Sequence, residues 1–280
     1  MLRPNRPMSG LEKFGIDAVS PSTINEWISY RPRFVLRKIY GYKDLPTSCA
    51  MERGNQSEYA AKLILQDKMG ADEAIGIAIK NFNKACTPDM KDYEFERMCI
   101  PSIVMAAVQE IKENFGEVVS FQEEIKGKLD EYNYRGFTDF VMMGKDGRKV
   151  IVDLKTAKRK PYKLSSSHAR QISLYSHALD CEAQLLYVVP HKQTDRKTKE
   201  VSIKATEGIW WSITKEDKQK YLDECQEVLK VMDMVLYNCN DKKEVAQICY
   251  PNIDDFYWDS PEIYKIRKEI WNVWWKHFRT

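Results

Sequence analysis

Two apolar strands joined by a short turn, each carrying an aspartate, constrain the fold of this chain more than any other feature. Residues 134–143 (YRGFTDFVMM) and 149–155 (KVIVDLK) are rich in aromatic and β-branched side chains, which favour strands. The segment Gly144-Lys-Asp-Gly147 between them has the composition of a tight turn. A three-residue loop with Gly147 in the left-handed conformation is a common closure for such a pair. The sequence therefore predicts an antiparallel hairpin.

The length of the turn predicts which residues face each other. Counting back from a three-residue loop places Asp139 opposite Asp153, whereas a four-residue loop would place it opposite Val152. Asp153 and Lys155 share a face because side chains alternate along a strand. Two opposed carboxylates repel each other inside an apolar hairpin unless a cation lies between them. A divalent ion and Lys155 are the candidate cations.

The tripeptide Asp153-Leu-Lys155 means little by its residue types alone, because six other acid-x-Lys tripeptides occur in the chain. Its setting distinguishes it from the others. It ends a strand that has the composition of a buried one, and a second acid meets it across the turn.

Helical and strand patterns alternate along the chain. The expected elements are, in order, a loose arm over 1–20, a helix capped by Ser22, helices over 55–69, 71–86 and 93–115, strands over 118–125, 134–143 and 149–156, a helix over 165–179, strands over 183–189 and 201–213, and helices over 214–237 and 261–278. This order predicts an α/β fold in which helices flank a mixed central sheet. We expect one continuous domain with a helical N-terminal region (1–115), a core (116–213) and a C-terminal helical region (214–280).

The distribution of charge is more informative than the net charge of +3. Cations gather in the segments 155–163 and 191–199, and between residues 28 and 43, where they alternate with aromatic residues. Such clusters suit a nucleic-acid backbone and its bases, although any one cluster by itself is better explained as a solvated surface.

The seven cysteines are scattered, odd in number and form no CxxC motif, which argues against a disulfide framework and a zinc ribbon. A reducing cytoplasm is the expected location. No apolar run approaches the length of a membrane span, so no membrane association is expected.

Several segments together resemble a known family. GFTDFV, VIVDLKTAK and Gln171-Ile-Ser-Leu-Tyr175 resemble the Gly-x-x-Asp, Asp/Glu-x-Lys and Gln-x-x-x-Tyr motifs of RecB-like PD-(D/E)XK nucleases. That family includes CRISPR-associated RecB-like nucleases and virus-encoded recombination exonucleases. Upstream, SPSTINEWISYRPRFVLRKIYGY resembles its opening helix, and the segment Arg53–Glu58 resembles its Gly-x-x-x-His/Glu element. The resemblance spans residues 20–190 with the motifs in the family's order.

The resemblance implies a restriction-endonuclease-like core and a metal-dependent active site. Its metal ligands would be Glu58, Asp139, Asp153 and the carbonyl oxygen of Leu154, an all-oxygen set that suits Mg²⁺ or Mn²⁺. Lys155 would orient or help to deprotonate the attacking water.

Four of these residues also have a purely structural interpretation. By the resemblance Gln171 and Tyr175, which share a helix face, would contact DNA and support the lysine. A half-buried helix face is the alternative for both, above all for Tyr175. His168 lies on the same face and is either a DNA contact or a solvated residue. Glu58 is a metal ligand by the resemblance, but a surface pair with Lys62 would explain it as well.

Cationic side chains in two segments are the expected DNA contacts. The loop after the Asp153 strand contributes four to the rim of the site: Lys158, Arg159, Lys160 and Lys163. The N-terminal region contributes three: Arg31, Arg33 and Arg37. That region must fold back over the rim if Glu58 is to reach the metal, which would enclose a channel. A narrow channel favours threading of a strand end.

The sequence therefore predicts a metal-dependent DNA exonuclease that acts in DNA recombination, repair or viral DNA processing. Its substrate would be single-stranded DNA or duplex ends, and a recombination or replication protein is a candidate partner. The alternatives are a structure-specific or restriction-type endonuclease of the same fold and a catalytically inert DNA-binding recombination subunit.

Several members of the family carry a four-cysteine iron–sulfur cluster, which we do not expect here. Tyr30-Arg31-Pro32 stands where the first Cys-Pro would be, and no cysteine follows Pro251. Cys225, Cys239 and Cys249 are spaced too widely for the usual arrangement.

Overall fold

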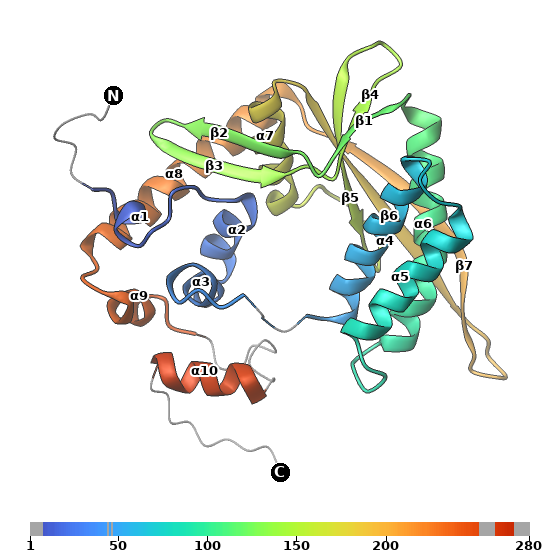
Figure 1. Ribbon diagram of the computed structural model, residues 1–280, viewed down its shortest axis with the longest axis horizontal. Coiled ribbons are helices and arrows are strands. Elements are labelled where there is room, and N and C mark those ends of the chain that lie inside the picture. Colours follow the sequence, from blue (N-terminus) through green and yellow to red (C-terminus); the bar gives the residue numbers. More distant parts are fainter. Residues whose placement is uncertain (1–7, 44, 46, 252–260, 272–280) are drawn as a thin grey trace. The chain divides into compact units, whose positions relative to one another are not determined.

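A computed structural model describes residues 8–43, 45, 47–251 and 261–271 (Figure 1). The chain forms two compact units. We call one the sheet unit; it consists of Thr47–Gly127 and Arg135–Leu222. We call the other the terminal unit; it consists of Met1–Pro46, Lys128–Tyr134 and Asp223–Thr280.

A five-stranded sheet forms the centre of the sheet unit. Its order is β1 (Val118–Phe121), β4 (Phe140–Met143), β5 (Lys149–Thr156), β6 (Glu182–Thr194) and β7 (Val201–Ser212). β5 and β6 are parallel, and the other neighbours are antiparallel. The α/β class with a mixed central sheet, predicted from the order of elements, is confirmed.

The turn between β4 and β5 has the predicted geometry. Gly147 has φ +79°, and the Gly144 N–H donates to the Arg148 carbonyl oxygen at 2.8 Å. Phe140 therefore pairs with Val152. The same register, continued by one residue, places Asp139 opposite Asp153, so the three-residue loop is confirmed and the four-residue alternative is wrong.

Helices cover both faces of the sheet because the apolar residues of β5 alternate between them. Val150, Val152 and Leu154 pack in one core with α4 (Cys49–Leu65), α5 (Ala71–Ala85) and α6 (Tyr93–Asn114). The opposite face, which carries Asp153, packs against α7 (Ser166–Leu179). Asp153 and Lys155 therefore lie on the face of the sheet that α7 covers.

A bend interrupts the strands that the sequence predicts over 118–125 and 134–143. Beyond the bend the chain forms a separate two-stranded sheet of β2 (Glu124–Leu129) and β3 (Tyr132–Phe137). At the bend Gln122 has φ +45°, and its N–H donates to the Asp139 carbonyl oxygen. Asp139 is thus held at the junction of two sheets and not inside a continuous strand.

α4 begins six residues before the predicted start, because the Ser48 side chain accepts a hydrogen bond from the Met51 N–H and caps it. Gly54 lies in its second turn, where a Cβ would lie 3.2 Å from the Thr156 Oγ1. Glycine therefore lets α4 approach β5 closely.

The terminal unit is helical. Its elements are α1 (Gly10–Lys13), α2 (Pro21–Ser29), α3 (Arg31–Phe34), the π-helical turn η1 (Val35–Ile39), the C-terminal part of α8 (Lys215–Asn238), α9 (Lys242–Ile248) and α10 (Pro261–Trp271). The predicted loose arm is wrong for the described residues 8–20. Leu11, Ile16 and Val19 are buried, and a Cβ on Gly10 would lie 2.0 Å from the Asp233 carbonyl oxygen of α8. The side chain that caps α2 belongs to Ser20 and not, as predicted, to Ser22.

None of the described helices combines the length and apolar character needed to cross a membrane.

Candidate active site

Asp153 is the centre of a cluster of charged side chains on β5. It is fully buried, with an exposed fraction of 0%. Its Oδ1 accepts a hydrogen bond from the Gln171 Nε2 at 3.0 Å. Its Oδ2 forms no aligned hydrogen bond, and the Lys155 ammonium at 2.6 Å compensates its charge as an ion pair.

Asp139 approaches Asp153 from the bend before β4. Its Oδ2 accepts a hydrogen bond from the Leu154 N–H at 2.8 Å. Burial, and then repulsion from the Asp153 carboxylate, raises the pKa of Asp139 well above its usual value. The two aspartates that the hairpin register predicts to face each other therefore share one electrostatic environment.

Glu58 joins these acids from α4. Burial raises the pKa of Glu58, the Lys155 ammonium opposes that shift, and the Asp153 carboxylate adds to it. Lys62 donates to the Gln122 Oε1 at 3.3 Å, and Gln122 also hydrogen-bonds Glu58. Within the described residues Glu58 and Lys62 form no ion pair, so the surface pair considered from the sequence does not account for the position of Glu58.

Lys155 is the cation among these carboxylates. Burial alone would lower its pKa, but the Asp153 and Asp139 carboxylates outweigh burial and raise the pKa above its usual value. While these carboxylates are its partners, Lys155 is therefore an ammonium group. It can donate hydrogen bonds and positive charge, but it is a poor proton acceptor.

A cavity of about 460 Å³ opens at the acids, lined by Glu58, Gln122, Phe137, Thr138 and Asp139. The Thr138 hydroxyl is buried, and no hydrogen bond satisfies it within the described residues. Phe137 is 57% exposed at this opening. The bend that interrupts the predicted strand thus gives access to Asp139.

The α7 helix packs on the face of β5 that carries Asp153 and supports the cluster there. Gln171 Nε2 donates to Asp153 and also, at 2.9 Å, to the Tyr175 hydroxyl. Tyr175 is buried, and burial raises its pKa. His168 Nδ1 hydrogen-bonds the Tyr187 hydroxyl, and burial lowers the pKa of His168 to about 4. Burial thus favours the neutral form of His168, and its half-buried position does not fit the solvated alternative.

Comparison with known proteins identifies the family. A profile of the PD-(D/E)XK nuclease superfamily matches residues 18–250. The chain belongs to the PD-(D/E)XK nuclease superfamily. No curated protein shows a significant match to the sequence.

Solved structures include one that shares the fold of this PD-(D/E)XK chain. It is a crystal structure from Eubacterium rectale, provisionally named an exonuclease, with a TM-score of 0.53 and 13% identity over 87% of this chain and 92% of that one. Protein SSO0001 matches with a TM-score of 0.33 and 10% identity over 80% of this chain and 95% of that one. Protein VC1899 from Vibrio cholerae matches with a TM-score of 0.22 and 9% identity over 84% of this chain and 65% of that one. The last two scores are too low to indicate a shared fold.

The PD-(D/E)XK superfamily generally uses divalent metals such as Mg²⁺ or Mn²⁺. Within the described residues no three His, Cys, Asp or Glu side chains already stand in a metal-holding arrangement. The charges nevertheless fit a cation, because Asp153, Asp139 and Glu58 all interact with the Lys155 ammonium, and one buried oxygen of Asp153 lacks an aligned hydrogen bond. Oxygen donors alone suit Mg²⁺ or Mn²⁺.

Two of the four predicted DNA contacts in the loop after β5 have carboxylate partners. The Lys158 ammonium lies 2.6 Å from Asp92 and 2.8 Å from Glu96, both in or next to α6. The Lys160 ammonium lies 2.8 Å from Glu207 of β7. The other two, Arg159 and Lys163, are exposed.

The three predicted arginine contacts lie in the terminal unit. Arg33 and Arg37 form ion pairs with Glu26 at 3.3 and 2.7 Å. The Arg31 guanidinium lies over the Trp27 ring, 5.0 Å from its centroid.

The sequence did not single out Gln122 or Tyr187, which the structure brings to the acids. Gln122 hydrogen-bonds Glu58 and Lys62, and Tyr187 is the partner of Lys155 in the parallel β5–β6 register. To predict that Tyr187 lies beside Lys155, one must know the register of β5 and β6. No tight turn joins these two strands, because α7 lies between them in the sequence, so the register cannot be derived from a turn length.

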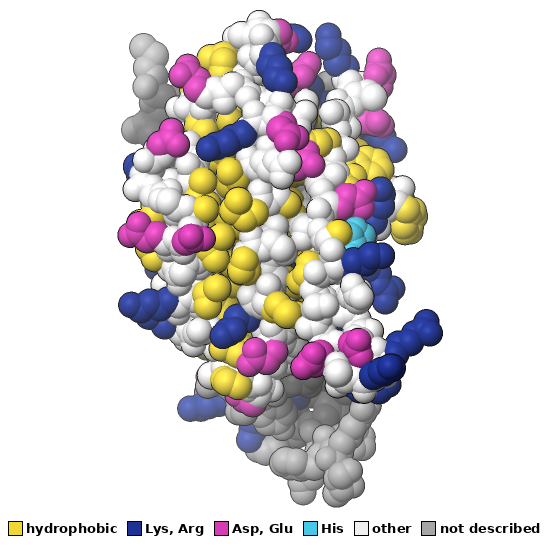
Figure 2. Space-filling view, turned by 90° about the vertical axis from the view of Figure 1, so that its right-hand side faces the viewer, with side chains coloured by type: hydrophobic (Ala, Val, Ile, Leu, Met, Phe, Trp, Pro, Cys, Tyr) yellow, Lys and Arg dark blue, Asp and Glu magenta, His cyan; other side chains and the backbone are white. Residues whose placement is uncertain are grey.

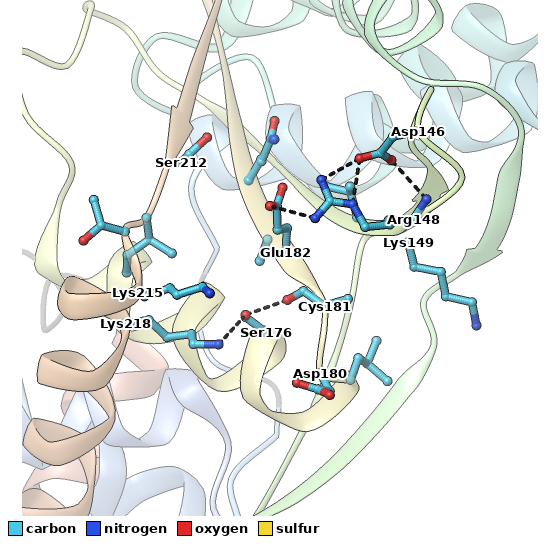
Figure 3. Close-up of a pocket in the computed structure, with 16 residues that line it drawn as sticks. Asp146, Arg148, Lys149, Ser176, Asp180, Cys181, Glu182, Ser212, Lys215 and Lys218 are labelled. Atoms are coloured by element: carbon cyan, nitrogen blue, oxygen red, sulfur yellow. Dashed lines mark hydrogen bonds and ion pairs between the residues drawn. The ribbon is translucent and has the colours of Figure 1, made fainter.

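A larger cavity, about 730 Å³, lies at the other end of β5 and β6 (Figure 3). Arg148 there lies between Asp146 and Glu182, while Lys218 donates to Ser176. It contains none of the cluster around Asp153. The larger cavity is therefore separate from the candidate site.

Proposed function

We propose that this protein is a divalent-metal-dependent deoxyribonuclease that acts on DNA ends. The observation that carries the proposal is the charge balance around Asp153. Burial and repulsion from the Asp153 carboxylate raise the pKa values of Asp139 and Glu58, although the Lys155 ammonium opposes both shifts. Such a site favours a divalent cation.

Each residue of the cluster has a role in this proposal. Glu58, Asp139, Asp153 and the carbonyl oxygen of Leu154 would hold Mg²⁺ or Mn²⁺. When bound, the ion neutralises charge on the phosphate and makes water a stronger nucleophile. The Lys155 ammonium orients the attacking water and the phosphate, since its raised pKa makes it a donor.

Residues of α7 hold this arrangement from behind. Gln171 fixes the Asp153 carboxylate through its amide, and Tyr175 receives the second hydrogen bond of that amide. Through the Tyr187 hydroxyl His168 keeps the start of α7 close to β6. No iron–sulfur cluster is part of the proposal, because the chain lacks the cysteines expected beside Tyr30 and beyond Pro251.

An exonuclease is favoured over an endonuclease by the name of the Eubacterium rectale structure that shares the fold. We propose DNA recombination, repair or viral DNA processing as the process, with a recombination or replication protein as a partner in the cytoplasm. Arg159 and Lys163, exposed beside the site, are proposed contacts to the DNA backbone.

The test uses single-stranded and duplex DNA, labelled at either end, together with a covalently closed circular duplex. We expect release of nucleotides from the linear substrates in Mg²⁺ or Mn²⁺, no reaction in EDTA, and an intact circle. The Asp139→Asn variant is the matched control for contaminating nucleases and should be inactive.

Each result separates the alternatives. Efficient cutting of the closed circle would replace the exonuclease with an endonuclease. Cleavage in EDTA would overturn the metal dependence. Absence of cleavage of every substrate in every metal, with DNA still bound, would favour the inert DNA-binding subunit.

A further inference from the structure

The β6–β7 hairpin continues beyond the rest of the sheet as an exposed arm, seen at the lower right of Figure 1. The neighbouring strand β5 ends at Thr156, which pairs with Val188. Every residue from His191 to Glu200 is exposed. We call residues 191–204 the basic arm.

An acid inside the turn organises the tip of the basic arm. The Asp195 Oδ1 accepts hydrogen bonds from the Lys197 N–H at 2.7 Å and the Thr198 N–H at 2.8 Å. The Asp195 N–H donates to the Glu200 carbonyl oxygen at 2.9 Å, which closes the loop. The backbone donors from Thr198 and Lys197 lower the pKa of Asp195. The Asp195 carboxylate is therefore hydrogen-bonded to the backbone of the turn.

Three cations project from this ordered turn: Arg196, Lys197 and Lys199. No ion pair involves any of them within the residues that the structure describes. On the face drawn in Figure 2 acidic and basic side chains are interspersed. At the tip the Asp195 carboxylate is engaged by the backbone of the turn, and Glu200, which follows Lys199, forms no ion pair within the described residues.

The base of the basic arm is anchored on α6. The Trp210 Nε1 donates to the Glu110 carboxylate at 2.8 Å. At Gly208 a Cβ would lie 2.5 Å from the Glu110 side chain, so this strand and helix approach as closely as a glycine allows. Lys192 lies over the Phe95 ring, 5.2 Å from its centroid. An anchored base holds the tip at a defined distance from the site.

That distance follows from the strand register. Lys155 pairs with Tyr187, and β6 extends from there to Thr194. Seven residues of strand span roughly 23 Å, which corresponds to about seven base pairs of B-DNA at 3.4 Å each.

We propose that the tip of the basic arm binds the phosphate backbone of duplex DNA about seven base pairs from the phosphate that is cut. The inference rests on the proposed function for the position of that phosphate. A two-stranded ribbon is narrow enough to enter the major groove of a duplex, and cations on a rigid turn meet phosphates without first being ordered. The arm thereby favours substrates with a duplex flank.

The test compares two variants that lose the same charge. The arm variant carries Arg196→Gln, Lys197→Gln and Lys199→Gln. The control variant carries Lys68→Gln, Lys80→Gln and Lys84→Gln, which are exposed in and near α5. Binding to fluorescent duplexes of about 5 and about 25 base pairs and to a single strand is measured in EDTA over a range of salt. Cleavage of the same DNA is measured separately with Mn²⁺.

We expect the arm variant to bind the long duplex at least about tenfold more weakly, with a salt slope smaller by about 0.9 for each phosphate that the arm no longer neutralises. The short duplex should be bound equally by all three proteins, because it does not reach the tip. In cleavage the arm variant should show a raised KM on the long duplex and an unchanged kcat.

An arm variant that binds the long duplex as the control variant does would overturn the proposal, even if the enzyme cuts DNA. An equal loss on single-stranded DNA would overturn the assignment to duplex. Conversely, a selective loss of long-duplex binding in a protein that cuts no DNA would leave the arm as a DNA-binding element and remove the proposed nuclease.

Discussion

Lys155 and Lys158 lie three residues apart, and both form ion pairs with carboxylates. The two sites differ in whether a cation or a phosphate could replace one of the partners. Lys155 is bound to Asp153, whose site has an excess of negative charge, so a metal ion can take over that compensation. Lys158 is held by Asp92 and by Glu96, which is buried. A phosphate would have to displace both acids, and Glu96 would lose a partner inside the protein. We therefore infer that Lys158 fastens its loop to α6.

Replacing Lys155 is expected to slow DNA cleavage by about 10²–10⁴-fold, the range for a positioned group that acts on proton transfer or charge. Lys155→Ala removes the ammonium, and it also leaves the Asp153 carboxylate without its ion pair. Lys155→Arg keeps the charge and the ion pair but changes the reach of the donor, so it should fold normally and still be slow. Single-turnover cleavage and DNA-binding affinity are measured for both.

The matched control for Lys155 is Asp146→Asn in the exposed turn of the same hairpin. Its carboxylate pairs with Arg148, and its loss should leave the rate unchanged. Wild-type rates in both Lys155 variants would remove this lysine from the mechanism.

At the scale of the element, the sequence predicts a helix or a strand pairing best where a nearby turn or cap determines its geometry. The β4–β5 register follows from the turn at Gly147, so the sequence places Asp139 opposite Asp153. α7 is predicted nearly to its ends because Ser165 caps it. Both rules act within a few residues of chain.

Prediction from the sequence fails where contacts between segments that are distant in the sequence determine the local structure. The break at Asp139 depends on its carbonyl oxygen accepting from Gln122 across the hairpin, and no residue pattern within 134–143 marks it. Likewise, the basic residues Lys158 and Lys160 look free in the sequence, but α6 and β7 supply their acids in the folded chain.

The turn that sets the register can be tested with two glycine substitutions. Gly147 has φ +79°, and no atom lies within 4 Å of the position that a Cβ would take, so Gly147→Ala should destabilise the protein by about 1–2 kcal/mol through backbone strain alone. Gly76 lies exposed inside α5 with similar open space, and Gly76→Ala should stabilise it by about 0.5–1 kcal/mol. Denaturant unfolding measures both. Equal effects of one sign would show that the left-handed turn does not set the stability of this hairpin.

At the scale of the molecule, the two units do not follow the order of the sequence. The terminal unit combines residues near both ends with the tip of the β2–β3 hairpin, whereas the residues of the acid cluster all lie in the sheet unit. The superfamily match over 18–250 covers parts of both units. Such a division depends on contacts between distant segments, so hydrophobic periodicity along the chain does not reveal it.

This division predicts a local response to pH and metal. Burial, followed by repulsion from Asp153, raises the pKa of Asp139, and burial also raises that of Glu58. A carboxyl group with a raised folded-state pKa stabilises the fold while it is protonated. That contribution is lost as the pH rises from the unfolded value of about 4 through the folded pKa. Metal-free protein should therefore become less stable in its sheet unit as the pH rises.

Hydrogen exchange, corrected for intrinsic rates, locates this change. Protection of β4, β5 and α7 should fall with rising pH in EDTA and return with Mn²⁺, which adds about 2.7 kcal/mol at a hundredfold excess over its Kd. α9, in the terminal unit, should respond to neither. In the Asp139→Asn variant residue 139 no longer titrates. The loss of protection at high pH and the gain of protection with Mn²⁺ should therefore both be smaller than in the wild type. Full protection of that variant by Mn²⁺ would exclude Asp139 as a ligand, and equal protection of α9 would show that the ion does not act locally.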